Sequence, residues 1–215
     1  MMINSLGREV PEEINGGKLV AYSGPYSINP NANIKVMKKQ SKILPGESKL
    51  KVSIEDAILA TGLKDGMTIS FHHHFREGDY IVGLVLKEIQ KLGIKNLTFA
   101  PSAVVNIKNP SIVDFVKDGT ISRIEASGIR GELGNAVIDG IMDQPVILRT
   151  HGSRPRAIES GELNIDIAFI GASASDDYGN ATGSIGKNAC GSLGYAMIDA
   201  RSAEKVVVIT DTLVP

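Results

Sequence analysis

The chain has 215 residues, enough to bury a sizeable core without a disulfide or a structural metal. Its formal net charge is -1, so no global field favours nucleic acid or an anionic membrane as a partner. A single cysteine excludes an intrachain disulfide and fits a reducing compartment. The apolar runs are too short for a membrane span, and no secretory leader is recognisable, so a cytoplasmic location is expected.

Residues 1–50 differ from the rest of the chain because Pro and Gly interrupt them and their helical periodicity is weak. We expect an extended arm that lies on the domain or on a neighbouring subunit. A binding role for the lysines at 35, 38 and 39 is the alternative. The regular domain is then expected over residues 51–215.

From Ser53 onward, helix and strand signals alternate. The predicted helices run from a Ser53 cap to Gly62, from an Asp79 cap to Gly93, from Asn109-Pro110 to Val116, and near 133–141. The predicted strands are 67–71, 97–100, 121–124, 146–149, 165–170 and 206–210. This alternation indicates an α/β fold with a mostly parallel sheet flanked by helices.

The last three of these strands are continuous apolar runs, which are typical of strands buried on both faces of a parallel sheet. Ligands in such sheets bind at the carboxyl ends of the strands. The loops to consider therefore follow Phe71, Ala100, Arg149 and Ile170.

The first of these loops carries three consecutive histidines and an arginine, in the segment Phe71 to Gly78. Imidazole, guanidinium and the free amides of a following helix make an anion site plausible. In an extended segment, His72 and His74 would share one side. The alternatives are a metal site, which has no carboxylate or thiolate at ligand spacing, and histidines that only satisfy buried backbone groups.

The second loop holds three arginines and a histidine between Arg149 and Arg156, and it is expected to open a helix at Ser153. The planar guanidinium matches the geometry of carboxylates and phosphates. The alternative is a surface patch in which the arginines pair with Glu159 and Glu162.

The third loop follows the strand at 165–170 with small residues and then the turn Asp176 to Asn180. Asp176 and Asn180 are expected to form the turn and not to bind a ligand. The glycine-rich segment after it has neither a P-loop nor a dinucleotide fingerprint. We expect Cys190 to be a buried, inert thiol.

The strand, the small-residue loop and Asp176-Asp177-Tyr178-Gly179-Asn180 together resemble the family I CoA-transferases. The histidine run departs from the glycine-rich loop of that family. This run, with 96–102 and Thr150-His151-Gly152-Ser153-Arg154-Pro155, specifically resembles the citrate lyase alpha subunit family. The resemblance covers essentially the whole chain and corresponds to the first of two fused CoA-transferase halves. The chain stops at Pro215 directly after a predicted strand, so we expect either a natural terminus or an incomplete chain.

The resemblance implies an acyl transferase that exchanges acetyl for citryl on an acyl carrier subunit and releases acetate. A beta subunit would then cleave the citryl thioester to oxaloacetate, and a gamma subunit would carry the phosphoribosyl-dephospho-CoA arm. No cofactor is expected on this chain itself, and a homo-oligomer is expected. The glutamate nucleophile of ordinary CoA-transferases lies in the second half, so no catalytic nucleophile is assigned.

A citrate site needs cationic partners for its carboxylates and preorganised donors for the developing oxyanion. We predict that His72, His74, Arg76, Arg149 and Arg154 contact citrate or the thioester. Three rivals remain open: an acyl-CoA:carboxylate CoA-transferase subunit, a sugar-phosphate isomerase of similar fold, and a non-catalytic half that docks the other subunits.

Overall fold

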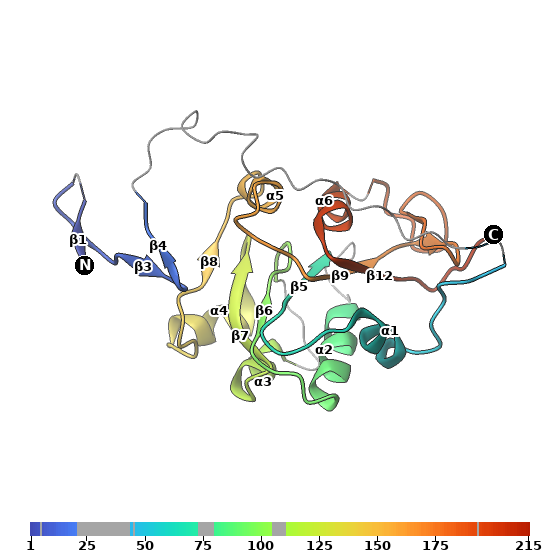
Figure 1. Cartoon of the computed structure of the whole chain (residues 1–215), viewed down its shortest axis with the longest axis horizontal. Helices are drawn as coiled ribbons and strands as arrows, with labels where there is room; N and C mark the ends of the chain where they lie inside the picture. Colours follow the sequence, from blue (N-terminus) through green and yellow to red (C-terminus); the bar gives the residue numbers. More distant parts are fainter. Residues whose placement is uncertain (5, 21–43, 45, 73–79, 105–110, 193) are drawn as a thin grey trace.

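The computed structural model describes residues 1–4, 6–20, 44, 46–72, 80–104, 111–192 and 194–215. Its helices are α1 (Ile54–Thr61), α2 (Ile81–Lys91), α3 (Ile112–Lys117), α4 (Gly131–Ile138), α5 (Ser153–Glu159) and α6 (Gly194–Ser202). The strands of the main sheet are β5 (Thr68–His72), β6 (Leu97–Phe99), β7 (Ile121–Ala126), β8 (Ile147–Leu148), β9 (Ile167–Gly171) and β12 (Lys205–Ile209). Helices cover both faces of this sheet (Figure 1).

The main sheet has six strands in the order β12-β9-β5-β6-β7-β8, and each of its five pairings is parallel. The predicted α/β architecture is therefore confirmed. The chain leaves β5 toward β6, β7 and β8, and then returns to the other side of β5 to form β9 and β12. The strand order thus reverses between β5 and β9.

The two edges of the sheet correct the predicted burial of two strands. Residues 146–149 and 206–210 were expected to be buried on both faces, but β8 and β12 are the edge strands. Leu148 is 62% exposed and Val206 is 39% exposed among the described residues. Of the three strands predicted to be buried on both faces, β9 alone is buried along its whole described length.

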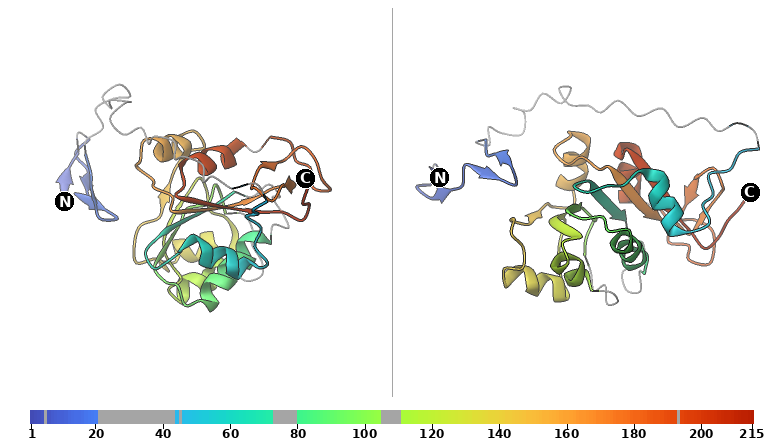
Figure 2. Two further views of the ribbon diagram at one scale, coloured as in Figure 1. Left: turned by 45° about the vertical axis from the view of Figure 1, so that its right-hand side comes forward. Right: turned by 60° about the horizontal axis from the view of Figure 1, so that its bottom comes forward.

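The two faces of the sheet are packed differently. One face packs on α1 to α4 through a large apolar core that includes Phe71, Phe99 and Phe169. The other face packs on α5 and α6 through a smaller cluster of mainly Ala and Ile residues, including Ala157 and Ala196. Figure 2 shows α5 and α6 together on one side of the sheet, with the remaining helices on the opposite side.

The capped start of α1 follows its sequence signal closely. The Ser53 hydroxyl accepts a hydrogen bond from the Asp56 N–H at 3.0 Å, so one free donor of the first turn is satisfied. The helix ends at Gly62, whose φ of 72° is left-handed. Glycine adopts that conformation without steric cost, which explains why it stops the helix.

Two other helices begin elsewhere than predicted. Asp79, the expected cap of α2, lies outside the described residues, and the N-cap is Tyr80, which makes no side-chain capping bond. Residues 109–110 also lie outside the described part. The N-cap of α3 is Ser111, whose hydroxyl accepts from the Val113 N–H at 3.3 Å.

The described part of the amino-terminal region forms two short antiparallel pairs. These are β1 (Met2–Ile3) with β2 (Glu9–Val10), and β3 (Glu13–Ile14) with β4 (Gly17–Lys18). The side chain of Asn15 donates to the Pro145 carbonyl at 3.2 Å, which connects this region to the segment before β8. The lysine cluster at 35–39 lies outside the described residues.

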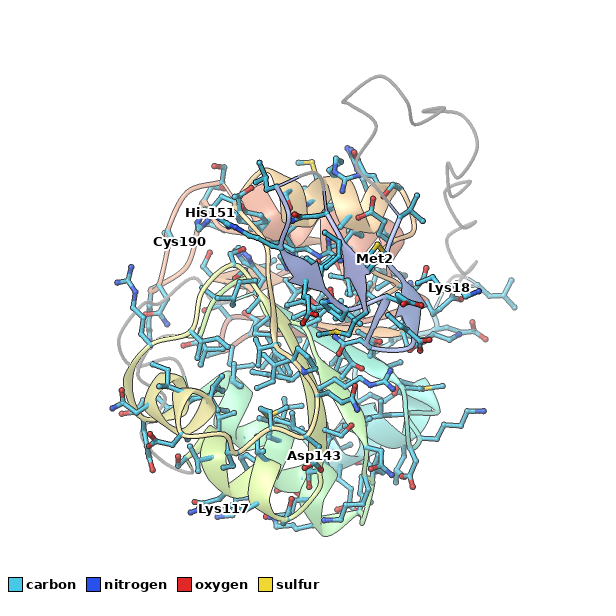
Figure 3. The ribbon with its side chains drawn as sticks, turned by 90° about the vertical axis from the view of Figure 1, so that its left-hand side faces the viewer. Met2, Lys18, Lys117, Asp143, His151 and Cys190 are labelled. Carbon is cyan, nitrogen blue, oxygen red and sulfur yellow. The ribbon has the colours of Figure 1, made fainter. Side chains whose placement is uncertain are left out.

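The remaining short pair, β10 (Ala174–Ser175) with β11 (Ala181–Thr182), follows β9. Figure 3 views the molecule from the side of the amino-terminal strands, with His151 toward the α5 and α6 layer and Lys117 in the opposite layer. No helix in the described ranges combines the length and apolarity needed to cross a bilayer.

Candidate functional site

The reversal of strand order between β5 and β9 marks the crevice where a parallel α/β sheet binds ligands. Ser70 and His72 alternate with Ile69 and Phe71 along β5, so they point to the face covered by α5 and α6. His72 is the last residue of β5, so this face and this strand end are where the predicted histidine loop begins.

Arg154 lies on the same face, in α5, and its side chain is only 1% exposed. One of its nitrogens, Nη2, donates to the Ser70 hydroxyl and to the Ala100 carbonyl, both at 2.9 Å. The same nitrogen lies 3.1 Å from a carboxylate oxygen of the fully buried Asp199 in α6. Ser70 in turn donates to Asp199 at 2.8 Å. Arg154 thus links its own helix, α5, to β5, to the residue after β6 and to α6 from inside the protein.

Tyr195, in the first turn of α6, lies above this buried pair. Its ring centroid is 6.0 Å from the guanidinium carbon of Arg154, a cation–π distance. The His72 ring is 6.4 Å away and the His151 ring is 5.4 Å away, edge-on to Tyr195. The phenol donates a hydrogen bond to the His151 backbone carbonyl. Two imidazoles from distant parts of the sequence therefore flank one aromatic ring.

Burial changes the pKa of two groups in this cluster, the Asp199 carboxyl and the Tyr195 phenol. Burial raises the pKa of the Asp199 carboxyl, and the charge of Arg154 and the hydrogen bond from Ser70 offset only part of that rise. Burial also raises the pKa of the Tyr195 phenol, with Arg154 opposing it. The Arg154 guanidinium stays charged at all relevant pH values, so a buried cation lies beneath the ring of Tyr195.

Arg149 is placed differently. Its guanidinium lies 3.2 Å from Glu125 and 3.3 Å from Glu162, at the edge strand β8. Arg156 makes a two-bond contact with Glu162 at 2.7 and 2.8 Å, so the alternative of a paired surface patch applies to these two arginines. Since β8 is three strands from β5, about 14 Å separates Arg149 from the strand that carries His72.

The structure therefore brings His151 and Arg154 to the histidine strand and leaves Arg149 apart, while His74 and Arg76 lie outside the described residues. Asp199 and Tyr195 are functional candidates that the sequence did not predict. Asp199 has a detectable signal, since an acid within an otherwise helical segment at a buried spacing needs a partner. The place of Tyr195 depends on how α5 and α6 pack together, which no local pattern specifies.

The turn at 176–180, between β10 and β11, has the structural role that was expected. Asp176 accepts from the backbone N–H groups of Tyr178 and Asn180 and from the Asn180 side chain. The Asn180 hydrogen bonds lower the pKa of Asp176 and hold it as a turn-forming anion. Cys190, in the glycine-rich segment, is exposed, so the expected burial of this thiol is wrong. Its loop runs over the surface and does not fold into either core.

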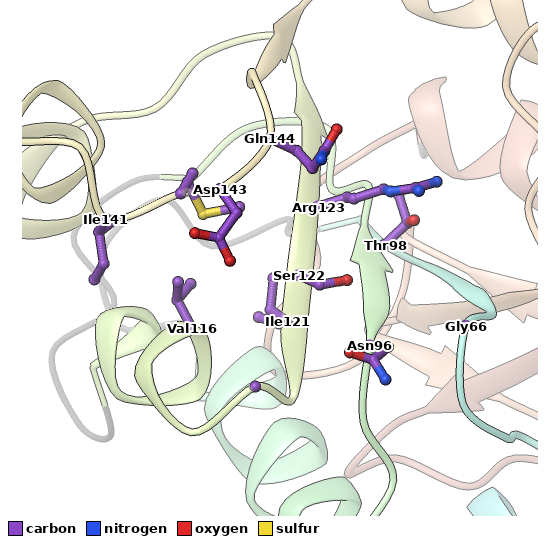
Figure 4. Close-up of a pocket in the computed structure, with 12 residues that line it drawn as sticks. Gly66, Asn96, Thr98, Val116, Ile121, Ser122, Arg123, Ile141, Asp143 and Gln144 are labelled. Carbon is purple, nitrogen blue, oxygen red and sulfur yellow. The ribbon is translucent and has the colours of Figure 1, made fainter. Parts of the chain in front are cut away.

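A cavity of about 610 Å³ lies elsewhere, near the amino ends of β6 and β7. Figure 4 shows Arg123, Ser122 and Asp143 around it, with Val116 and Ile141 contributing apolar surface. In parallel α/β sheets ligands gather at the opposite ends of the strands, so we place the candidate site at Tyr195 and not here.

The parallel sheet, its helices on both faces and a buried guanidinium beside the crevice define an α/β protein whose ligand site lies at the strand ends. Residues 47–215 match the family model described as citrate lyase, alpha subunit (CitF). The chain belongs to the citrate lyase alpha subunit family.

Two curated relatives are named citrate lyase alpha chain. That of Haemophilus influenzae is 48% identical over 78% of this chain and 33% of its own length, and that of Escherichia coli is 46% identical over 79% and 33%. A crystal structure from Streptococcus mutans, described as the alpha subunit of citrate lyase in complex with citrate, is 48% identical with a TM-score of 0.84. It matches 98% of this chain and 41% of that one. The chain thus spans about a third of the length of the curated relatives.

Proposed function

We propose that this chain forms part of the acyl transferase subunit of citrate lyase, which exchanges acetyl for citryl on an acyl carrier thioester. The observation that carries the proposal is the 48% identity, over 98% of this chain, to a structure described as a complex with citrate. The family match over residues 47–215 supports the same activity.

In the proposed reaction, the carrier thiol exchanges its acetyl group for a citryl group in two steps. A citrate carboxylate oxygen attacks the thioester carbonyl of the acetyl-carrier, the carbon–sulfur bond breaks, and the thiolate leaves. The thiolate then attacks the citryl carbonyl of the resulting mixed anhydride, and acetate leaves with the bridging oxygen. Both steps develop an oxyanion that needs fixed donors, and the two other citrate carboxylates need cationic partners.

We place citrate at the carboxyl end of β5, on the face of the sheet that carries Tyr195. His72 and His151 flank this position, and α6 begins beside it, so its first-turn amides add a partial positive charge. Among the five predicted contacts, His72 is the described residue that best fits a direct role. Arg154 supports the site from beneath, because its guanidinium is engaged with Ser70 and Asp199.

The remaining predicted contacts follow from the same placement. His74 and Arg76 continue the chain from His72 and are proposed to contact citrate or the thioester. Arg149 is proposed to act farther out, toward the carrier arm, because it sits at the edge strand. The proposed partners are a beta subunit, which cleaves the citryl thioester, and a gamma subunit, which carries the phosphoribosyl-dephospho-CoA arm. Homo-oligomerisation and a cytoplasmic location belong to the same proposal.

A thioester exchange assay on the assembled enzyme tests this function. Acetylated carrier and acetyl-CoA are compared as donors, with isotopically labelled citrate as the acceptor. We expect labelled citryl-carrier to form with release of one acetate, and the carrier to be the preferred donor. A preference for acetyl-CoA as the donor would instead indicate an acyl-CoA:carboxylate CoA-transferase. Absence of exchange with both donors would contradict the proposal.

A further inference from the structure

Tyr195 makes a set of contacts that a residue of simple core packing would not make. It is only partly buried, yet its ring meets two imidazoles and a guanidinium, and its phenol donates to the backbone of the turn at His151. The other hydrogen bonds of this turn are local, since Thr150 accepts from the N–H groups of Ser153 and Arg154. The phenol therefore links the turn to α6.

The ring of Tyr195 rests on a guanidinium that cannot easily move. Arg154 is fixed by Ser70, Ala100 and Asp199 through Nη2, whereas its buried Nε and Nη1 make no hydrogen bond within the described residues. The part of the guanidinium charge on these two nitrogens is therefore not matched by a hydrogen bond. A positive charge of this kind holds the face of an aromatic ring and favours anions near it.

From these contacts we propose that Tyr195 is a positioning residue of the citrate site. It would hold the His151 imidazole on the same side of the sheet as His72, so that both meet the carboxylates of citrate that do not react. The inference rests on the proposed function, because it names how that site is preorganised. The phenol acts through His151, and Tyr195 takes no part in the bonds that form and break.

One variant separates the hydrogen bond of Tyr195 from the contacts of its ring. Tyr195→Phe keeps the ring contacts and removes only the donor to the His151 carbonyl. Tyr178→Phe is the matched control, because Tyr178 lies in the turn between β10 and β11 and contributes its backbone N–H there. For the assembled enzyme we expect Tyr195→Phe to raise the citrate KM about tenfold with kcat within about twofold, as loss of ground-state positioning predicts. The control should match wild type.

A second readout does not depend on turnover. The rate at which diethyl pyrocarbonate modifies His151 is followed by peptide mass spectrometry in the assembled enzyme without citrate. We expect Tyr195→Phe to increase this rate several-fold, because the turn is no longer tied to α6, and Tyr178→Phe to leave it unchanged. If wild type failed to exchange citrate, the proposed function would fall while this readout still tested the positioning.

Two results would overturn the inference. One is an unchanged His151 modification rate with an unchanged citrate KM in Tyr195→Phe. The other is a parallel loss of kcat and thermal stability with no selective change in KM, which would give Tyr195 a purely structural role.

Discussion

The two faces of the sheet use the same strand for different purposes. Ile69 and Phe71 of β5 enter the large apolar core against α1 to α4, where Phe71 stacks on Phe169 with centroids 5.2 Å apart. Ser70 and His72 alternate with them and face α5 and α6, where the buried contacts are polar. One face provides most of the hydrophobic stabilisation, whereas the other combines a smaller apolar cluster with charge held in a fixed position at a cost in stability.

This contrast predicts different responses to substitution. On the apolar face, each substitution should lower the free energy of unfolding in proportion to the side-chain volume removed. The losses from well-separated sites should add. On the polar face, removing one partner should cost more than removing both, because a single change leaves a buried charge without compensation.

The largest loss is expected on the apolar face. Phe71→Ala removes a ring that contacts both Phe99 and Phe169, and it should lower the free energy of unfolding by about 4 kcal/mol. Chemical denaturation measures this value, and the exposed Leu148→Ala serves as the control with little expected change. A loss below about 1 kcal/mol would mean that this face is not the main core.

A somewhat smaller loss is expected on the polar face. Asp199→Ala leaves the Arg154 guanidinium buried without its carboxylate and should cost about 3 kcal/mol. The double variant Arg154→Met with Asp199→Leu should recover most of that loss while citrate binding stays impaired. Additive losses in the double variant, measured by denaturation, would contradict the contrast between the faces.

The smallest effect concerns a carboxylate at the rim of the apolar side. Burial raises the pKa of Asp118, but hydrogen bonds from Gln90, Thr120 and Lys95 outweigh it and bring the pKa to about 2. A lowered carboxyl pKa contributes stability above the ordinary value of 3.8, and this is lost as pH falls from 3.8 through about 2.

Solvent screening limits this contribution to about 1 kcal/mol. Asp118→Asn should therefore flatten the acid limb of the stability curve between pH 4 and about 2, as followed by thermal melts. Gln90 and Lys95 remain in place in this variant, so the carboxylate charge alone is tested. An acid limb identical to that of wild type would show that Asp118 does not contribute.

The fold was predictable where local pattern and tertiary position agree. The cap at Ser53, the stop at Gly62 and the fully buried β9 follow directly from residue type and periodicity. The edge position of β8 and β12 was not predictable, because an apolar run has the same sequence in the middle of a sheet as at its edge. Strand order depends on long-range packing, so periodicity does not encode it.

The candidate site was predictable only in outline. The sequence placed His72 and the arginine-rich loop at strand ends, and the structure brings His72 and Arg154 to one face. Residue type could not reveal that Arg154 is buried against Asp199, because a guanidinium in a loop looks the same whether it meets a ligand or an acid. It also could not reveal Tyr195, whose neighbours are fixed by the packing of α5 and α6.

We propose that citrate binds at the carboxyl end of β5 and not at the cavity near the amino ends of β6 and β7. Citrate titration calorimetry on the assembled enzyme compares His72→Gln with Arg123→Ala, which lines that cavity. We predict that His72→Gln weakens citrate binding at least tenfold, about 1.4 kcal/mol, while Arg123→Ala leaves it unchanged. A loss of affinity in Arg123→Ala with wild-type affinity in His72→Gln would contradict the account.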